Sequence, residues 1–84
     1  MERDAIRRKI LKKLYVHRII QHKLTSFDNL PKGFPSHLRG QVKEIAEQLI
    51  KEGLLLSKPT NYGLEVSLNH KRIEEIEEII EEIL

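Results

Sequence analysis

The sequence predicts a mainly α-helical fold with one small β-hairpin, an α+β domain. Three segments repeat apolar residues at the three- and four-residue spacing of amphipathic helices, and one shorter segment alternates apolar and polar residues as a hairpin does. We expect one domain over residues 1–84, with a basic helix in 1–24, a helix, turn and hairpin region in 25–68, and an acidic helix in 69–84. A chain of 84 residues holds one small core and leaves little room for an enzyme pocket.

A basic amphipathic helix is expected from residue 5 to about residue 21, with Asp4 as its N-cap. Its apolar side carries Ile6, Ile10, Leu14, His17 and Ile20. The opposite side carries Arg7, Arg8, Lys9, Lys12, Lys13 and Arg18. This basic side is either a flank for DNA or a solvated surface.

Residues 22–35 are irregular and rich in turn-forming side chains. Only a short helix fits there, from Ser26 or Phe27 to Leu30, and Pro31 ends it. The segment therefore predicts a cramped second helix.

A longer helix is expected from Ser36, which follows a proline and suits the N-cap, to a stop at Gly53. Gly40 inside this pattern costs about 1 kcal/mol relative to alanine. Either the helix starts near Gly40 or a close backbone approach requires glycine there. The apolar stripe is Leu38, Val42, Ile45, Ala46, Leu49 and Ile50. The outer face is Ser36, His37, Gly40, Lys43, Glu44, Glu47 and Lys51.

Two half-buried strands follow this helix without a linker. The first alternating set is Leu54, Leu56, Leu64, Val66 and Leu68, and the other set is Leu55, Ser57, Glu65 and Ser67. Residues 59–63 form the connecting loop, because they are turn-forming types. The loop tip therefore exposes Lys58, Thr60, Asn61 and Tyr62.

Asn69 is expected to cap a last helix that runs from His70 to the C-terminus. One face is apolar and comprises Ile73, Ile76, Ile79, Ile80, Ile83 and Leu84. The other comprises Glu74, Glu75, Glu77, Glu78, Glu81 and Glu82. Phosphate repels this acidic face, so we expect it to point away from any nucleic acid.

The formal charge of +2 conceals two opposed halves. Residues 1–43 hold 11 Lys/Arg and 3 Asp/Glu, whereas residues 44–84 hold 4 and 10. A basic half is typical of a surface that binds phosphates. The alternative is a thermophile-like surface in which charges serve solubility and ion-pair networks.

The order of helix, glycine stop and wing-like hairpin resembles winged helix-turn-helix domains. The resemblance spans roughly residues 25–68 and rests on element order and on the junction Glu52-Gly53-Leu54-Leu55. It implies a winged helix-turn-helix with an added C-terminal helix, including a short strand before the second helix. It also implies that the helix before the hairpin enters the major groove of DNA and that the hairpin tip reaches the backbone or the minor groove.

The same resemblance implies a set of nucleic-acid contacts. The base-reading residues are His37, Arg39, Gln41 and Lys43, with Ser36 at a phosphate. Arg39 suits guanine and Gln41 adenine, although both lie on the flanks of the outer face. The hairpin adds Lys58, Thr60, Asn61 and Tyr62, where Tyr62 either stacks on a base or sugar or packs over its own hairpin. Flanking phosphate contacts come from Lys32, Arg7, Arg8, Lys12 and Lys13.

Catalysis, metals and cofactors are not expected. Cysteine is absent, and no two of His17, His22, His37 and His70 have the i,i+3 or i,i+4 spacing of helical metal ligands. No run approaches the roughly 18 apolar residues of a membrane span, and no signal-peptide pattern is present. A soluble cytoplasmic protein is the expectation.

The leading hypothesis is a small transcriptional regulator that binds double-stranded DNA, generally or sequence-specifically. We expect a homodimer through the first and last helices, whose opposite charges attract, although that pairing could equally lie within one chain. A winged-helix protein-interaction module is the alternative, favoured by the lone hairpin lysine, by Glu44 and Glu47, and by Leu55 if it is exposed. RNA binding is third, because few aromatic residues are available to stack on bases.

Overall fold

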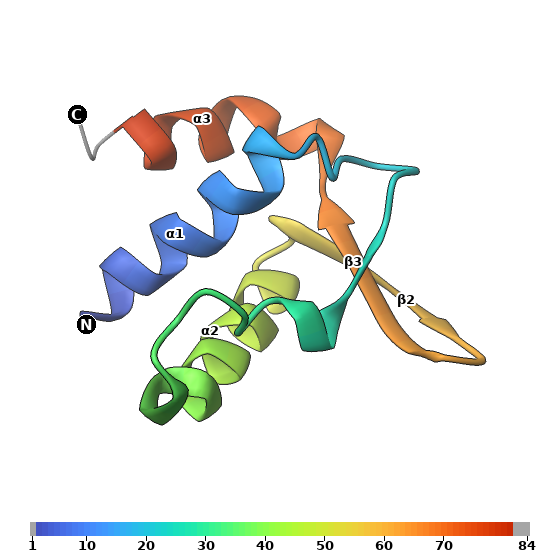
Figure 1. Cartoon of the computed structure of the whole chain (residues 1–84). Coiled ribbons are helices and arrows are strands. Elements are labelled where there is room, and N and C mark those ends of the chain that lie inside the picture. Colours follow the sequence, from blue (N-terminus) through green and yellow to red (C-terminus); the bar gives the residue numbers. More distant parts are fainter. Residues whose placement is uncertain (1, 82–84) are drawn as a thin grey trace.

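The computed structural model describes residues 2–81 as three α-helices and a three-stranded antiparallel sheet, which confirms the α+β fold class (Figure 1). The helices are α1 (Arg3–Val16), α2 (Arg39–Lys51) and α3 (Ile73–Glu81). The strands are β1 (Thr25–Ser26), β2 (Leu55–Thr60) and β3 (Gly63–Leu68), in the order β1-β3-β2. Three 3₁₀ turns complete the described elements: η1 (Phe27–Asn29), η2 (Ser36–Leu38) and η3 (His70–Arg72).

The core forms where α1 packs against α2, α3 and β3. Figure 1 shows α1 between the other two helices, with the β2–β3 hairpin projecting beyond them. The stripe expected on the second long helix is confirmed, since all its members are buried except the partly buried Ile50. α1 contributes Ile6, Ile10, Leu11 and Leu14, and the sheet and α3 contribute Leu55, Val66, Leu68 and Ile76.

The first helix ends five residues earlier than expected. Arg18 adopts the left-handed conformation at φ 59°, and its N–H donates to the carbonyl of Tyr15 at 3.1 Å. The N–H of Ile19 donates to the carbonyl of Leu14 at 2.9 Å, which completes a Schellman stop. His17, expected on the apolar side of the helix, is instead its exposed C-cap, and Arg18 lies outside the helix.

The residues after this stop pair with the sheet. Ile20 forms an isolated bridge to Leu68, with Leu68 N–H donating to Ile19 at 2.8 Å and Gln21 N–H donating to Leu68 at 3.0 Å. This segment lies beside the end of β3 and contacts Ser67, which belongs to the set that we expected on the side away from the core. Ser67 is therefore fully buried, and its hydroxyl donates to the carbonyl of Gln21 at 2.9 Å.

Two of the expected N-caps are wrong. Glu2 occupies the N-cap of α1, and Asp4 lies in the first turn. Ser36 opens a 3₁₀ turn, and the α-helical part starts only at Arg39, without a side-chain cap. Gly40 therefore lies in the first turn of α2, which confirms that the helix starts near it.

The stop of α2 at Gly53 is confirmed. Gly53 has φ +82°, and its N–H donates to the carbonyl of Ile50 at 3.1 Å. The N–H of Leu54 donates to the carbonyl of Leu49 at 3.1 Å. These two bonds are the Schellman pattern, and the chain enters β2 immediately afterwards.

The hairpin is longer than expected, because Pro59 and Thr60 belong to β2 and only residues 61–62 form the turn. Pro59 lies on an edge strand, where its missing N–H breaks no ladder bond. Leu55 pairs with Leu68 on the core side of the sheet and is 1% exposed. Leu55 is therefore not exposed and does not favour a protein-interaction module.

The short strand before the second helix and the expected cap at Asn69 are both confirmed. β1 pairs with β3, and Ser26 caps η1 by accepting from the N–H of Asp28 at 3.3 Å. Asn69 caps the last helix, which begins as η3, by accepting from the N–H of Lys71 at 3.0 Å.

One residue of the acidic face lies elsewhere than expected. Glu77 is half-buried, and its carboxylate accepts a hydrogen bond from the Tyr15 hydroxyl at 2.5 Å, which joins α3 to α1. The expected positions of Glu82, Ile83 and Leu84 lie outside the described residues.

Candidate nucleic-acid interface

A hollow of about 420 Å³ lies between the first turn of α2 and the loop that follows η1. We call it the basic hollow, because it brings together three of the predicted contact residues, Lys32, Arg39 and Lys43. Its other lining residues are Asp28, Pro31 and Gly40. Residues distant by up to 15 positions in the sequence thus meet at one place on the surface.

Gly40 leaves the backbone of α2 uncovered in the basic hollow. A Cβ atom at this position would have no neighbour within 4 Å. No close contact inside the protein therefore requires glycine here. The open space lets the backbone of a bound ligand approach the helix.

The acidic residues near the basic hollow are paired with cations. Lys43 Nζ lies 3.6 Å from a carboxylate oxygen of Asp28, and their side chains are 48% and 82% exposed. An ion pair this exposed contributes about 0–1 kcal/mol, so a phosphate can replace the carboxylate. Glu44, which we expected to oppose phosphate, lies 3.6 Å from the guanidinium of Arg3 on α1. Glu47 is exposed farther along α2.

Two lysines of α1 hold the loop beside the basic hollow. Lys13 Nζ donates to the carbonyl oxygens of Asn29 and Lys32 at 3.3 and 2.9 Å. Lys9 Nζ donates to the carbonyl oxygen of Gly33 at 3.1 Å. Lys13, predicted as a phosphate contact, therefore donates hydrogen bonds to the loop that carries Lys32.

The other predicted cations of α1 lie away from the basic hollow. Arg7 pairs with the carboxylate of Glu52, at the opposite end of α2 from Arg39. Arg8 lines a separate hollow with residues of α1 and with Ile79 of α3. Lys12 is exposed on α1.

The remaining predicted residues of the α2 region differ in exposure. Ser36 and His37 are exposed on the 3₁₀ turn η2, directly before α2. Gln41 is half-buried, as its place on the flank of the helix implies. Ser36 and His37 can therefore reach a ligand at the helix start, whereas Gln41 is less accessible.

The hairpin tip presents one aromatic side chain to solvent. Tyr62 is 99% exposed, so it does not pack over its own hairpin. Thr60 fixes the turn, because its hydroxyl donates to Gly63 at 2.8 Å and accepts from the N–H of Tyr62 at 3.2 Å. Lys58 stands opposite Glu65 across the strands, so its charge is partly balanced. Asn61 is exposed beside Tyr62.

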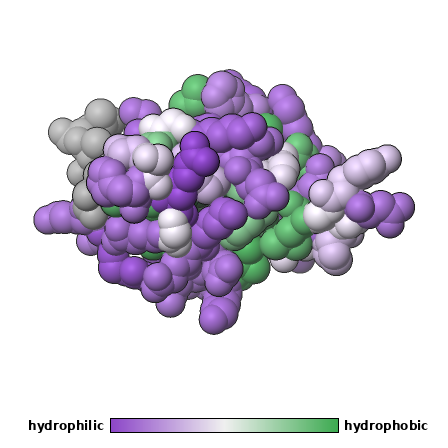
Figure 2. All heavy atoms as spheres, turned by 60° about the horizontal axis from the view of Figure 1, so that its bottom comes forward, coloured by the Kyte–Doolittle hydropathy of each residue, from purple (hydrophilic) through white to green (hydrophobic). Residues whose placement is uncertain are grey.

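Figure 2 shows the face that carries the outer side of α2 and the hairpin. Most of it is hydrophilic, and hydrophobic residues gather beside the hairpin. Leu64 of β3 is 36% exposed and pairs with Pro59 of β2. The hairpin thus combines polar tip residues with apolar surface nearer its base.

The acidic helix α3 lies on the far side of α1 from α2 (Figure 1). The expectation that its acidic face points away from nucleic acid stays a prediction. Glu77 has a local effect instead, because its hydrogen bond and charge raise the pKa of the Tyr15 hydroxyl above 10.0.

No local sequence pattern indicates that Asp28 lines the basic hollow, or that Arg3, Lys9 and Lys13 bond to neighbouring groups. Each of these roles depends on contacts between elements. Within residues 2–81 no helix combines the length and apolarity needed to cross a membrane. The same part of the chain contains no group of three histidine, cysteine or acidic residues arranged to hold a metal ion.

Comparison of the chain with protein-family models, with curated proteins and with solved structures finds no match. Functional inference for this chain therefore rests on the geometry and charge of its own residues.

Proposed function

We propose that this protein is a winged helix-turn-helix domain that binds double-stranded DNA, as a small cytoplasmic transcriptional regulator. The observation that carries the proposal is the basic hollow, where Lys32, Arg39 and Lys43 surround the uncovered backbone at Gly40. The elements around it support the proposal. A short turn precedes α2, and the projecting hairpin pairs with the short strand β1.

Each cation of this surface has a distinct role in the proposal. Lys32 and Lys43 contact phosphates on either side of the α2 start, and Arg39 reaches a base edge, with guanine preferred because its O6 and N7 accept two hydrogen bonds. Lys58 on the hairpin adds a third phosphate contact. Three such contacts give a slope of about −2.7 for log affinity against log salt concentration.

Duplex DNA is favoured over single-stranded RNA, because single-strand readers stack bases on exposed aromatic side chains. Phe34 is buried, Phe27 is partly buried in the core, and the Tyr15 hydroxyl is bonded to Glu77. Among residues 2–81, Tyr62 alone is a fully exposed aromatic residue. One ring does not make a stacking platform.

The test is charge reversal in the basic hollow with a matched control. We expect Arg39→Glu and Lys43→Glu each to weaken binding to a generic duplex at least tenfold at low salt, measured by fluorescence anisotropy. Lys71→Glu makes the same charge change at an exposed site in η3, the turn before α3, and we expect it to weaken binding less than twofold. Equal losses in all three variants would indicate an effect of net charge alone and would contradict the assignment. Far-UV circular dichroism confirms that each variant is folded.

We further propose that the protein binds DNA as a homodimer. Within one chain α1 and α3 already pack together through their apolar sides. A dimer must therefore use what remains exposed on them, including Val16, which is 61% exposed, and the outer glutamates of α3. Analytical ultracentrifugation tests this directly, and a monomer at micromolar concentration would contradict it.

Docking onto a protein is the second candidate function. It is favoured by the hydrophobic surface beside the hairpin in Figure 2 and by the exposed Leu64 and Tyr62. The variant Leu64→Ser separates the two candidates. It should leave duplex binding unchanged if DNA is the ligand, and it should abolish capture of a stoichiometric protein if docking is the function.

A further inference from the structure

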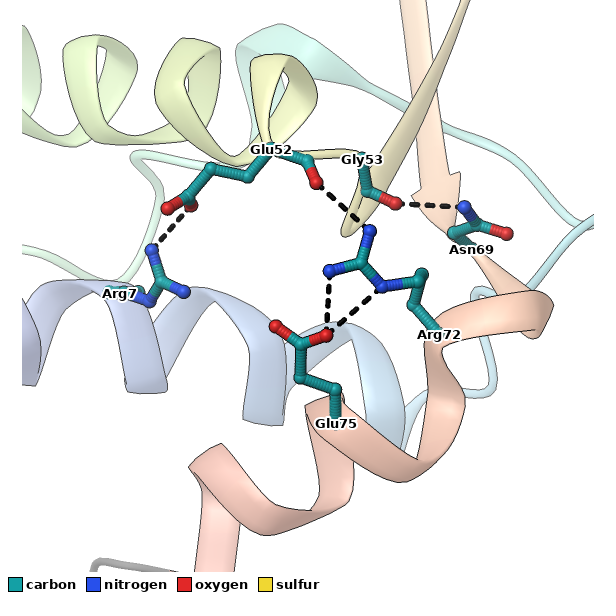
Figure 3. Close-up of polar contacts among 6 residues, drawn as sticks. All are labelled: Arg7, Glu52, Gly53, Asn69, Arg72 and Glu75. Carbon is teal, nitrogen blue, oxygen red and sulfur yellow. Dashed lines mark hydrogen bonds and ion pairs between the residues drawn. The ribbon is translucent and has the colours of Figure 1, made fainter.

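Three hydrogen bonds tie the junction between α2 and β2 to the segment that follows β3, and Figure 3 shows the two that side chains donate. Asn69 Nδ2 donates to the carbonyl oxygen of Gly53 at 2.8 Å, and Asn69 N–H donates to Leu54 at 3.0 Å. Arg72 Nη1 donates to the carbonyl oxygen of Glu52 at 3.2 Å. The carbonyl groups at the end of a helix lack hydrogen-bond partners inside the helix. At the end of α2, Arg72 supplies such a partner for the carbonyl of Glu52.

The guanidinium of Arg72 is held in position by a second partner. Glu75 Oε1 accepts from Nε at 3.0 Å and from Nη2 at 2.6 Å, which leaves Nη1 directed at the helix end. Glu52 is also fixed from the other side, because its carboxylate pairs with Arg7 of α1. Glu52, directly after α2, thus bonds both to Arg7 of α1 and to Arg72 of η3, the turn before α3, as Figure 3 shows.

Arg72 also lies close to the backbone at the hinge between helix and hairpin. A Cβ atom on Gly53 would lie 3.3 Å from Arg72 Nη1. Gly53 has φ +82°, and only Leu54 lies between it and the start of β2. The side chain of Arg72 therefore contacts the backbone at the point where α2 passes into the hairpin.

Both ends of the hairpin are held at this place, since β2 starts after Gly53 and β3 ends before Asn69. Strands of six residues extend about 20 Å, so a rotation of about 10° at the base moves the tip by roughly 3.5 Å. A displacement of the tip by that distance is enough to break a hydrogen bond between the tip and its ligand.

We infer that Arg72, together with Asn69, is a positioning residue that fixes the angle between α2 and the hairpin, and so the distance between the basic hollow and the hairpin tip. The consequence of this geometry, that the basic hollow and the hairpin bind one DNA molecule together, rests on the proposed function. The angle between α2 and the hairpin can itself be measured without DNA. Arg72 and Glu75 are partly exposed, so their contribution is mainly to orientation.

The first experiment measures the hairpin position directly. The chain contains no cysteine, so Glu47→Cys on α2 and Asn61→Cys at the tip accept two spin labels specifically. Pulsed electron resonance should give a narrow distance distribution in this background and a shifted or broadened one after Arg72→Ala. An unchanged distribution would overturn the inference. Glu75→Gln, which only releases the guanidinium, should give a smaller broadening and serves if Arg72→Ala does not fold.

The second experiment tests the consequence by double-mutant cycles of duplex affinity. Lys58→Ala should weaken binding about threefold in the parent protein and have no effect once Arg72→Ala is present. Arg39→Ala should weaken binding by the same factor in both backgrounds. Independent losses for Lys58 and Arg72 would show that Arg72 acts only through stability and would overturn the positioning role. Absence of duplex binding in the parent protein refutes the proposed function, and the distance measurement still decides the role of Arg72.

Discussion

Replacing Gly53 by alanine should destabilise the protein by about 2 kcal/mol. The left-handed conformation at φ +82° costs a residue with a Cβ atom about 1–2 kcal/mol. The new Cβ atom would lie 3.3 Å from Arg72 Nη1, so the guanidinium must shift by a few tenths of an ångström and its bond to the carbonyl of Glu52 weakens, a loss of up to about 1 kcal/mol. Alanine also lowers the conformational entropy of the unfolded chain, which offsets about 0.5 kcal/mol of this destabilisation. For a domain of this size the net change lowers Tm by roughly 8–16 °C.

Two other glycines separate these contributions in the same thermal unfolding assay by circular dichroism. Gly33 has φ +93° with no atom within 4 Å of a Cβ, so Gly33→Ala should cost only the conformational part, about 1 kcal/mol. Gly40 is helical and equally open, so Gly40→Ala should stabilise the protein by up to about 1 kcal/mol. A cost for Gly53→Ala no greater than that for Gly33→Ala would refute the role of the Arg72 contact.

The remaining predictions concern three buried or bridging contacts. The Glu77 carboxylate raises the pKa of Tyr15, so the folded state holds the phenolic proton more tightly than the unfolded chain. The stabilisation is therefore fully present below pH 10.0 and is lost as the pH rises through the higher pKa of the folded protein. Spectrophotometric titration should show the Tyr15 pKa falling in Glu77→Gln, and an unchanged value would contradict the assignment. Ser67→Ala removes a fully buried donor to Gln21 and should cost about 1 kcal/mol in urea unfolding, whereas a neutral result would mean that the bond contributes nothing. Lys13→Met keeps the aliphatic stem and removes the ammonium, so amide hydrogen exchange should accelerate in residues 29–33 and remain unchanged in α2.

The parts of the fold that the sequence predicts well are those fixed by neighbouring residues. The apolar stripe of α2 follows from spacing alone, and Gly53 and Asn69 end and begin helices through their own local chemistry. The early end of α1 was missed because Arg18 adopts a left-handed conformation that glycine usually supplies. The apolar Ile20 continues the helical spacing, yet its pairing with Leu68 depends on a strand almost 50 residues away.

The candidate site was predictable by region and not by residue. Lysines with equal local sequence signals have different roles, because Lys13 donates to backbone carbonyls whereas Lys32 lines the basic hollow. The distinction depends on where η1 and its loop pack against α1, which no local pattern encodes. Glu44 likewise seemed an obstacle in the sequence, and its ion pair with Arg3 appears only when α1 and α2 are packed.

The most direct test of the central claim is a titration of the unmodified protein into a labelled generic duplex at several salt concentrations, with single-stranded RNA as the control. Binding through three phosphate contacts predicts tight association at low salt, a slope of about −2.7 for log affinity against log salt, and weaker binding to the RNA. No duplex binding at low salt, or equal affinity for both nucleic acids, would contradict the claim that the basic hollow and the hairpin form a surface for double-stranded DNA.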